Sequence, residues 1–538
     1  MHPSYKRQDI RATPSFNAPS LIVSTKYHIP LLLGIAVVAR IVVFHVDQVI
    51  FSWRATDMAS IAMGYYRNGF HFLNPQVYWG GNGPGYVETE FPIIPFLLAV
   101  LYRLFGVHEW LALVIPMLSG VGVVIVVYLL SRHLFDPAAG FIAGVFTAVS
   151  PPLAALSMGL WPDPPMIFWG TLGLYLLVRW AEENTWGYFF SGAFATTLAI
   201  LLKLTALYLG IPILFLCFAK YKFGLWKAPA VWLLAFLVLV PPALWYSHAY
   251  TLYKEYHNTF GILTGGYLKF ANAELLLDPA FYSLSLGWMI FYHLTPFVFV
   301  AFVYGVLSSQ RDELHYIFHV WFGAVVVYIL VVAQGVSMGH FQYLIPVVPP
   351  AACLAGFGTL SLIRKLESLP RIATWPKTRW YLVLILVFLA GVIVPTHFYH
   401  RPDKYTTRVW THDKKTGLSV GRVTVPGSLI IVVDTQMNGV IPERIMTPPN
   451  VFYFSDRRGW YVALSWLSKD LIEQRRREGA RYLVITGNAV SSFGASRPEI
   501  KAYLSTHYSA ILDNEDGVVY DLALKRDGRK SERTNRAG

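Results

Sequence analysis

The chain has 538 residues, of which 55% are hydrophobic, 16% aromatic and only 14% charged. Soluble proteins carry about a quarter charged residues, so this composition excludes an ordinary soluble protein and indicates a polytopic α-helical membrane protein. The net charge of +13 lies largely at the chain ends and in short loops, not on a soluble face with exposed aromatic residues, which argues against nucleic-acid binding. Cys217 and Cys353 lie in apolar segments, so no disulfide framework is indicated.

The first apolar segment follows a basic N-terminus, residues 1–28, which is expected to lie in the cytoplasm. This segment, residues 29–50, is long and carries no small-x-small cleavage site, so we expect it to remain as a signal anchor. A span needs about 20 apolar residues, and about 11 spans (range about 10–13) are expected in the transmembrane domain, residues 29–399. After 29–50 the candidates are 109–131, 137–156, 164–180, 187–202, 204–219, 228–246, 284–308, 315–333, 341–363 and 380–397.

Positive charge in short loops marks the cytoplasmic side and sets the orientation of these spans. The basic loops alternate correctly only if the short, proline-containing segment 91–105 lies at the interface and 187–219 is a hairpin turning at Lys203. The loops 51–108 and 247–283 then lie outside, in a protein integral to the cell (inner) membrane. The outer face thereby collects Asp57, Glu88, Glu90, Asp163, Lys203 and His340.

Residues 400–524 are expected to form an extracytoplasmic α/β domain, followed by a basic, disordered tail, residues 525–538. Strands are predicted at 429–434 and 482–486, with an edge strand at 517–524, and helices at 464–478 and 498–505. This alternation suggests three layers. No glycine-rich phosphate loop is present, so nucleotide binding is not indicated.

Asp57 follows the first span and precedes a helical pattern at residues 58–66. Two roles are compatible with this position: the N-cap of that helix, and the general base that accepts a proton from an attacking hydroxyl. Asp163 stands beside prolines at the start of a span, where it either caps the helix or serves in a site, because carboxylates near the bilayer core are costly.

Lys203 is isolated among apolar residues, so it either snorkels to the surface or supplies a point charge to a phosphate or a carboxylate. Glu88 and Glu90 either solvate a loop, bind a divalent cation or position a sugar hydroxyl, and the pair alone is a weak metal signal. Arg40 lies inside the first span and is expected to snorkel or to pair with a carboxylate. His340 is a capping or substrate-contacting residue, and no second histidine at ligand spacing supports zinc.

Several of these motifs occur in an order that resembles the GT-C superfold of integral-membrane glycosyltransferases, over roughly residues 25–400. They are Asp57 after the first span, Glu90-Phe91-Pro92, Leu104-Phe105-Gly106-Val107-His108-Glu109, Arg132-His133-Leu134-Phe135, Asp163-Pro164, Lys203 and the segment from His340 through Tyr343 to Pro346. The nearest branch is the bacterial protein-mannosyltransferase and aminoarabinose-transferase-like group.

The resemblance implies transfer of a sugar from a polyprenyl-phosphate donor to an acceptor hydroxyl of a glycan, lipid or protein, with inversion. It implies Asp57 as base, Asp163 as a second acidic residue that organises the site, and Lys203 as a phosphate contact. Glu88, Glu90, His340, Tyr343 and Arg40 are further substrate-binding candidates, and no cofactor is certain, although a divalent cation is possible. The chain departs from the family pattern at Met58 and at Glu90-Phe91, where many relatives carry an acidic residue and a Lys or His. These departures leave acceptor class and metal use open.

Two other functions fit a membrane protein with charges in its spans. A transporter or flippase of lipid-linked sugars is the main alternative, but transporters place ionisable residues near the midplane and show related halves, whereas no internal repeat is visible here. The other is a non-catalytic protein that binds a polyprenyl lipid.

Overall fold

The computed structural model describes residues 24–43, 52–263, 269–308, 313–368, 382, 386, 404–435 and 448–525. The basic N-terminus up to residue 23, most of the predicted span 380–397 and the tail beyond Lys525 lie outside this set. The described residues fall into two compact units. The first unit takes in those within 1–45, 113–245 and 268–401, and the second those within 46–112, 246–267 and 402–538.

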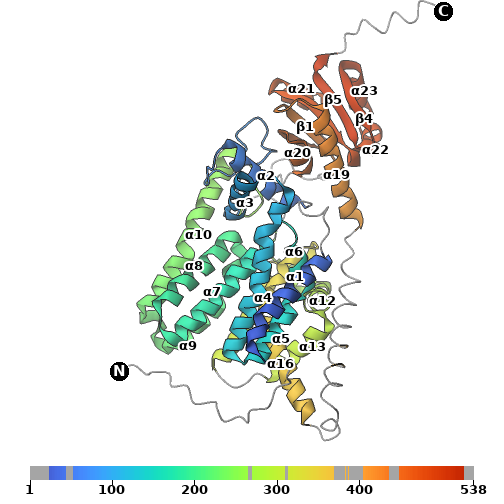
Figure 1. Cartoon of the computed structure of the whole chain (residues 1–538). Coiled ribbons are helices and arrows are strands. Elements are labelled where there is room, and N and C mark those ends of the chain that lie inside the picture. The colour runs from blue at the N-terminus through green and yellow to red at the C-terminus, as the bar shows by residue number, and fades with distance from the viewer. Residues whose placement is uncertain are drawn as a thin grey trace, which may run out of the picture. The chain divides into compact units, whose positions relative to one another are not determined.

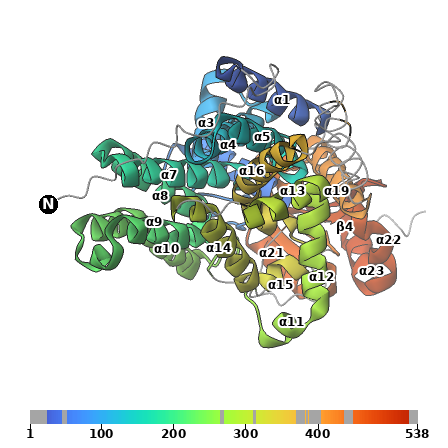
Figure 2. The ribbon, with the colours of Figure 1, turned by 90° about the horizontal axis from the view of Figure 1, so that it is seen from below.

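The described residues of the first unit form helices joined by turns and loops (Figures 1 and 2). Its helices are α1 (His28–Val43), α4 (Val114–Leu134), α5 (Pro137–Ala148), α6 (Pro151–Leu156), α7 (Asp163–Glu183), α8 (Trp186–Leu202), α9 (Gly210–Tyr221), α10 (Pro229–Tyr256, whose end belongs to the second unit), α11 (Ala273–Leu277), α12 (Pro279–Gly287), α13 (Thr295–Ser308), α14 (Ile317–Val331), α15 (Ala333–Ser337) and α16 (Val348–Glu367). Figure 2 shows α7 beside α8, and α5 close to α4 and α16.

Within the described residues, six helical segments are long and apolar enough to cross a membrane, which confirms the helical membrane class. They are Thr25–Val42, Glu109–Leu134, Leu204–Lys227, Pro229–Tyr256, Leu314–Val331 and Phe341–Leu366. A seventh is possible if the bent pair Pro279–His293 and Thr295–Ser308 forms one span. The predicted spans 137–156, 164–180 and 187–202 are helical but shorter or less apolar, so the number of about eleven stays a prediction.

Helix starts in the first unit follow local sequence. The Asp136 side chain accepts hydrogen bonds from the backbone N–H groups of Ala138 and Ala139, and Pro137 occupies the first helical position of α5. Asp278 and Pro279 repeat this arrangement at the start of α12. An aspartate followed by proline satisfies the unpaired N–H groups of a first helical turn and fixes its φ angle.

A sharp break separates α12 and its π-helical continuation (Trp288–His293) from α13. The two segments meet at an angle of 104°. His293 is 1% exposed, and its two ring nitrogens each lie 3.1 Å from a backbone carbonyl oxygen, those of Trp288 and Phe341. Thr295 has a φ of +65°, an unusual value for a β-branched residue, so the break is fixed by specific local packing.

Two glycines allow α13 and α16 to cross in close contact. A Cβ atom on Gly305 would lie 1.9 Å from the carbonyl oxygen of Leu354, and one on Gly358 would lie 2.2 Å from that of Ala301. Backbone atoms cannot move aside as a flexible side chain can, so only glycine fits at this crossing.

We therefore expect Gly305→Ala to lower the stability of the fold by roughly 1–3 kcal/mol or more, the usual cost of overpacking a tight core. Thermal unfolding of the purified protein in detergent measures the effect. Gly323→Ala in α14 is the matched control, because nothing lies within 4 Å of its added Cβ, and it should not lower the unfolding temperature. Equal stability of the two variants would contradict the close crossing.

The second unit combines a helical segment with an α/β domain. The helical segment contains α2 (Trp53–Asn68) and α3 (Ile93–Phe105), and α3, with only 13 residues, is too short to cross a bilayer unaided. The α/β part contains helices α19 (Lys404–Val423), α20 (Asn450–Ser455), α21 (Lys469–Arg477), α22 (Gly487–Ser496) and α23 (Pro498–His507). Its strands are β1 (Leu429–Asp434), β2 (Arg458–Ala463), β3 (Ala480–Thr486), β4 (Tyr508–Asn514) and β5 (Gly517–Lys525).

The five strands form one sheet in the order β2-β1-β3-β5-β4, with β2, β1 and β3 parallel and the other two strands antiparallel. Ile431 and Val433 of β1 join a core with residues of α21, α22 and α23, whereas their neighbours Ile430 and Val432 are buried on the opposite face. Helix α19 packs against β3 and α20, so the sheet is covered on both faces. The predicted three layers are thus present in outline.

Two local predictions for this domain need correction. The strand at 517–524 is not an edge strand, because β5 pairs with both β3 and β4, and β4 forms the edge. The predicted helix 464–478 is a short 3₁₀ turn, Leu464–Trp466, followed by α21, because the Ser468 side chain caps a new helix by accepting a hydrogen bond from the Leu471 N–H. The sequence patterns also missed β2 and β4.

Candidate active site

Asp57 lies inside helix α2, one turn after its start. The helix begins at Trp53, and the Ser52 side chain accepts a hydrogen bond from the backbone N–H of Ala55. Serine is a favoured N-cap residue, so this helix starts five residues earlier than the apolar pattern predicted. The capping role considered for Asp57 is therefore wrong, and the buried carboxylate has no role in starting the helix.

Asp57 is 9% exposed, and among the described residues one hydrogen-bond donor lies beside its carboxyl group. Trp79 Nε1 donates a hydrogen bond of 3.0 Å to Asp57 Oδ1. Burial raises the pKa of Asp57 to about 7, since removal from water disfavours the charged form. The Trp79 hydrogen bond and the Arg54 guanidinium pull the pKa down, and the Glu90 carboxylate pushes it up. Asp57 therefore exchanges its proton near neutral pH.

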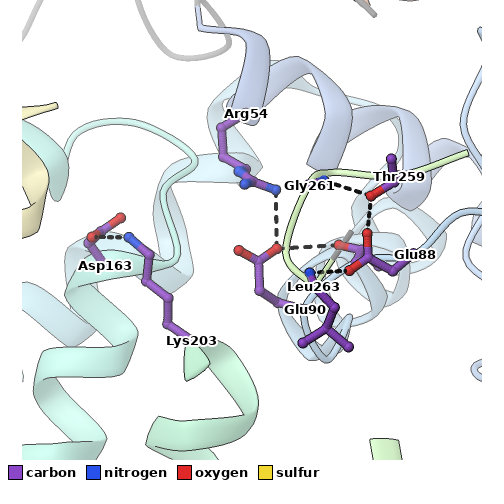
Figure 3. A network of polar contacts seen from close by, with 9 residues as sticks. Arg54, Glu88, Glu90, Asp163, Lys203, Thr259, Gly261 and Leu263 are labelled. Carbon is purple, nitrogen blue, oxygen red and sulfur yellow. Dashed lines mark hydrogen bonds and ion pairs between the residues drawn. The ribbon is translucent and has the colours of Figure 1, made fainter. Parts of the chain in front are cut away.

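Glu90 forms an ion pair with Arg54, which lies one helical turn before Asp57 in α2. Arg54 Nη1 lies 3.1 Å from Glu90 Oε2, and Figure 3 shows the two side chains directed at each other. The Arg54 guanidinium also stacks over the ring of Phe260, 4.9 Å from its centroid. Glu90 is only 8% exposed, so the proposed role in solvating a loop is wrong for this residue.

Glu88 is 0% exposed and has hydrogen-bond donors at both of its carboxylate oxygens. Its Oε1 accepts a bond of 2.9 Å from the Leu263 N–H, and the Thr259 hydroxyl donates to Oε2 (Figure 3). Burial raises the pKa of Glu88, while these two donors lower it. Loop solvation is excluded for Glu88 as well, because its carboxylate instead joins the segment 246–267 to the loop after α2.

The Glu88–Glu90 pair lacks a third metal ligand within the part of the chain that the structure describes. No group of three or more His, Cys, Asp or Glu side chains in that part is arranged to hold a metal ion. We refer to Asp57, Arg54, Trp79 and Glu90 below as the Asp57 cluster.

A second cluster lies in the first unit, where α8 ends and α7 begins. Lys203 Nζ lies 2.6 Å from Asp163 Oδ1, as Figure 3 shows, and 5.4 Å from the centroid of the Tyr343 ring. Asp163 is 1% exposed, and its Oδ2 atom has no hydrogen-bond partner within the described part of the chain. Lys203 follows the last residue of α8 and points at this carboxylate, so the snorkelling role is wrong. Asp163 is the first residue of α7 and makes no side-chain capping bond.

Arg40 is buried in α1, and no carboxylate among the described residues pairs with it. The residue is 1% exposed, its Nη1 donates to the Ala36 carbonyl oxygen at 2.9 Å, and its Nη2 lies 3.4 Å from Ser157 Oγ. Its Nε has no hydrogen-bond partner among the residues that the structure describes. The expectation that Arg40 snorkels is therefore wrong, and no described carboxylate meets the expectation of an ion pair.

His340 precedes the 3₁₀ helix Phe341–Val347 and makes no capping bond with its side chain. Its ring lies edge-on to Tyr343, with 6.0 Å between the ring centroids, and its Nδ1 is 3.4 Å from Gln342 Nε2. It is thus a neighbour of the Asp163–Lys203–Tyr343 cluster through Tyr343.

The structure brings together Asp57 with Glu90 in one unit, and Asp163, Lys203 and Tyr343 in the other. Sequence reasoning missed two members of the Asp57 cluster, Arg54 and Trp79. The spacing of three residues between Arg54 and Asp57 was a usable signal, because residues three apart share a helix face. Trp79 is 22 positions from Asp57 and gave no such signal.

Comparison with known families and structures gives a consistent set of matches. A family model described as dolichyl-phosphate-mannose-protein mannosyltransferase matches residues 89–246. A search of the curated proteins found no match.

Among solved structures, ArnT from Cupriavidus metallidurans in the apo state matches with a TM-score of 0.58 at 16% identity, over 91% of this chain and 97% of that chain. ArnT bound to undecaprenyl phosphate matches with a TM-score of 0.57 at 15% identity, over 93% and 98%. The Archaeoglobus fulgidus oligosaccharyltransferase AglB, in complex with an inhibitory peptide and a dolichol-phosphate, matches with a TM-score of 0.55 at 14% identity, over 86% and 70%. The shared fold confirms the resemblance found in the sequence.

Proposed function

Because this chain has the GT-C superfold of integral-membrane glycosyltransferases, we propose that it transfers a sugar from a polyprenyl-phosphate donor to an acceptor hydroxyl at the outer face of the membrane. The observation that carries the proposal is the buried Asp57, whose pKa of about 7 suits a general base at neutral pH. The ligands in the matched structures support the donor class, since one holds undecaprenyl phosphate and another a dolichol-phosphate. A glycan, a lipid or a protein serves as acceptor.

In the proposed reaction the acceptor oxygen attacks the anomeric carbon while Asp57 takes the hydroxyl proton. The bond between the anomeric carbon and the phosphate oxygen breaks, and polyprenyl phosphate leaves with the bonding electrons. A single displacement of this kind inverts the anomeric centre. The base contributes typically about 10²–10⁴-fold to the rate of such a proton transfer.

The Asp163–Lys203–Tyr343 cluster supplies the cation that a phosphate leaving group needs. An ammonium group has three N–H donors, and the ion pair with Asp163 uses one of them, so Lys203 can also contact the donor phosphate. Asp163 then orients Lys203, and Tyr343 and His340 lie beside this ion pair. Arg40, Glu88 and Glu90 are the remaining substrate-binding candidates from the sequence. The observed contacts of Glu88 and Glu90 support a positioning role for these two residues.

The pH dependence of transfer follows from the Asp57 pKa. A base must be deprotonated to act, so kcat/KM should fall about tenfold per pH unit below about pH 7 and reach a plateau above it. Initial rates between pH 5.5 and 8.5, in detergent, with mannosyl-phosphoundecaprenol as probe donor, measure this limb. A flat profile over this interval would count against Asp57 as the base.

The function itself is tested by lipid and glycan profiling of a deletion strain, followed by transfer with the purified protein. If the protein is an enzyme, the deletion strain should accumulate a lipid-linked sugar and contain a glycan, lipid or protein that lacks one sugar residue. The purified protein should then restore transfer in detergent. A flippase of lipid-linked sugars would also cause accumulation, but it could not transfer the sugar where no bilayer separates donor from acceptor. Restoration only in sealed vesicles would thus favour the transporter alternative.

A further inference from the structure

The turn that carries Trp79 is held by the C-terminal sheet. The Gly81 N–H donates a hydrogen bond of 2.8 Å to the Gly459 carbonyl oxygen, and the Gly459 N–H donates one of 3.0 Å to the Tyr78 carbonyl oxygen. The Arg458 guanidinium donates to the carbonyl oxygen of Gly83. Gly459 and Arg458 are the first residues of β2, so the start of this strand is bonded to both sides of the turn.

Two further contacts fix the same surface. Arg67 at the end of α2 forms an ion pair with Asp456, and the Asn82 side chain donates a hydrogen bond of 3.3 Å to the Glu478 carbonyl oxygen. The hydrogen bond from Arg458 to the turn is part-buried. Loss of this donor would leave the carbonyl oxygen of Gly83 unsatisfied, which costs free energy. All of these residues belong to the second unit, in which the C-terminal domain and the turn pack together.

The backbone of the turn depends on one glycine. Gly81 has a φ of +69°, and a Cβ atom there would lie 2.6 Å from Trp460 Nε1. Gly83, two residues on, has ample space, since the nearest atom to its added Cβ is 3.6 Å away. The contact between the turn and β2 therefore requires glycine at position 81 but not at position 83.

Trp79 lies between Tyr78 and Gly81, so the hydrogen bonds of these two residues with Gly459 of β2 fix the position of its indole ring. That indole donates to Asp57 Oδ1, and no described residue donates a hydrogen bond to Oδ2. One carboxylate oxygen is thus held while the other remains available to an acceptor hydroxyl.

We propose that Trp79 is a positioning residue for Asp57, and that the C-terminal sheet holds Trp79 in place through Gly459 and Gly81. This inference rests on the proposed function of Asp57 as base and gives the C-terminal domain a task in the same reaction. The charged groups of this unit that act on the Asp57 carboxyl group are Arg54 and Glu90, which are paired with each other. The contacts between β2 and the turn reach Asp57 through Trp79.

The direction of the effect follows from the hydrogen bond. The Trp79 N–H stabilises the charged carboxylate and so holds the Asp57 pKa below the value that burial alone would give. Trp79→Phe removes the donor and keeps an aromatic ring, and Gly81→Ala should displace the donor. Both changes should raise the Asp57 pKa and move the acidic limb of kcat/KM to higher pH. At pH 6 the loss should be about tenfold, because a hydrogen bond to a charged group is worth roughly that factor, and at pH 8.5 it should be small.

The test uses the full chain, purified in detergent, in the variants Trp79→Phe, Gly81→Ala, the matched control Gly83→Ala and the double variant Trp79→Phe/Gly81→Ala. Labelling of Asp57 by dicyclohexylcarbodiimide, which reacts with protonated carboxyl groups, is followed by mass spectrometry against pH. Transfer from mannosyl-phosphoundecaprenol is measured at the same pH values.

We expect the labelling midpoint of Trp79→Phe and of Gly81→Ala to shift to higher pH, and that of Gly83→Ala to stay with the unmodified protein. The double variant should shift no further than Trp79→Phe alone. A Gly81→Ala variant that loses activity equally at every pH, or a double variant with additive shifts, would overturn the proposal. Labelling needs no substrate, so it separates the two inferences: unshifted midpoints refute the positioning role, and shifted midpoints with an active Asp57→Asn refute only the catalytic role.

Discussion

Replacing Asp57 by asparagine should lower transfer by about 10²–10⁴-fold, the range in which a general base contributes. The amide cannot take the hydroxyl proton, yet its oxygen can still accept the hydrogen bond from Trp79. Initial rates with a polyprenyl-phosphate sugar, in detergent and near pH 8, measure the effect. At that pH the unmodified residue is mostly ionised.

This substitution is also expected to keep the fold. Burial raises the Asp57 pKa above its unfolded value, so the stabilising contribution of the neutral form is complete below the unfolded pKa of 3.8 and is lost as pH rises through about 7. Asparagine stays neutral, and the variant should therefore be at least as stable as the unmodified protein at pH 8. The exposed Asp470→Asn in α21 is the control, with unchanged transfer. An Asp57→Asn protein that transfers at the normal rate would exclude the assigned base.

Lys203→Met should destabilise the first unit by about 3–5 kcal/mol, because it leaves the buried carboxylate of Asp163 without its partner. Asp163 is 1% exposed and cannot recover water as a substitute. Thermal unfolding in detergent measures the loss. Lys254→Met, at an exposed position of α10, is the control and should unfold like the unmodified protein.

The double variant Lys203→Met/Asp163→Asn separates the structural role of Lys203 from its role toward the donor. Removing both charges should restore most of the stability, since no unpaired charge then remains buried. Transfer should stay low if Lys203 serves as proposed, because the donor phosphate would then lack its cation. If the double variant regains both stability and normal transfer, Lys203 serves only the fold.

The sequence predicted those parts of the fold that depend on apolar runs and short-range signals. The buried strand at 429–434 was predicted with the observed bounds of β1, because six consecutive residues, all but the last apolar, lie in the centre of a sheet. The helix break at Lys203 was also found, and the notion that Lys203 serves a neighbouring carboxylate was confirmed by its ion pair with Asp163.

Elements without such signals were missed. Strand β4 is mostly exposed at the sheet edge, so it has no alternation of apolar and polar residues to read. Helix α2 was predicted to begin after Asp57, because the cap at Ser52 precedes residues that are not periodic. Trp79 could not be predicted as a partner of Asp57, because their contact depends on a turn that β2 holds in place.

The docking of β2 on the turn also bears on how the protein is made. Arg458 and Gly83 are 375 positions apart, so the turn leaves the ribosome long before the strand that binds it. At synthesis rates of roughly 5–20 residues per second, the interval is about 20–75 s. During that time the nascent chain already carries Asp57 but not the sheet that completes its surroundings. The surroundings of Asp57 would thus be complete only when translation is nearly finished, and on the proposed function a chain that ends before β2 would be inactive.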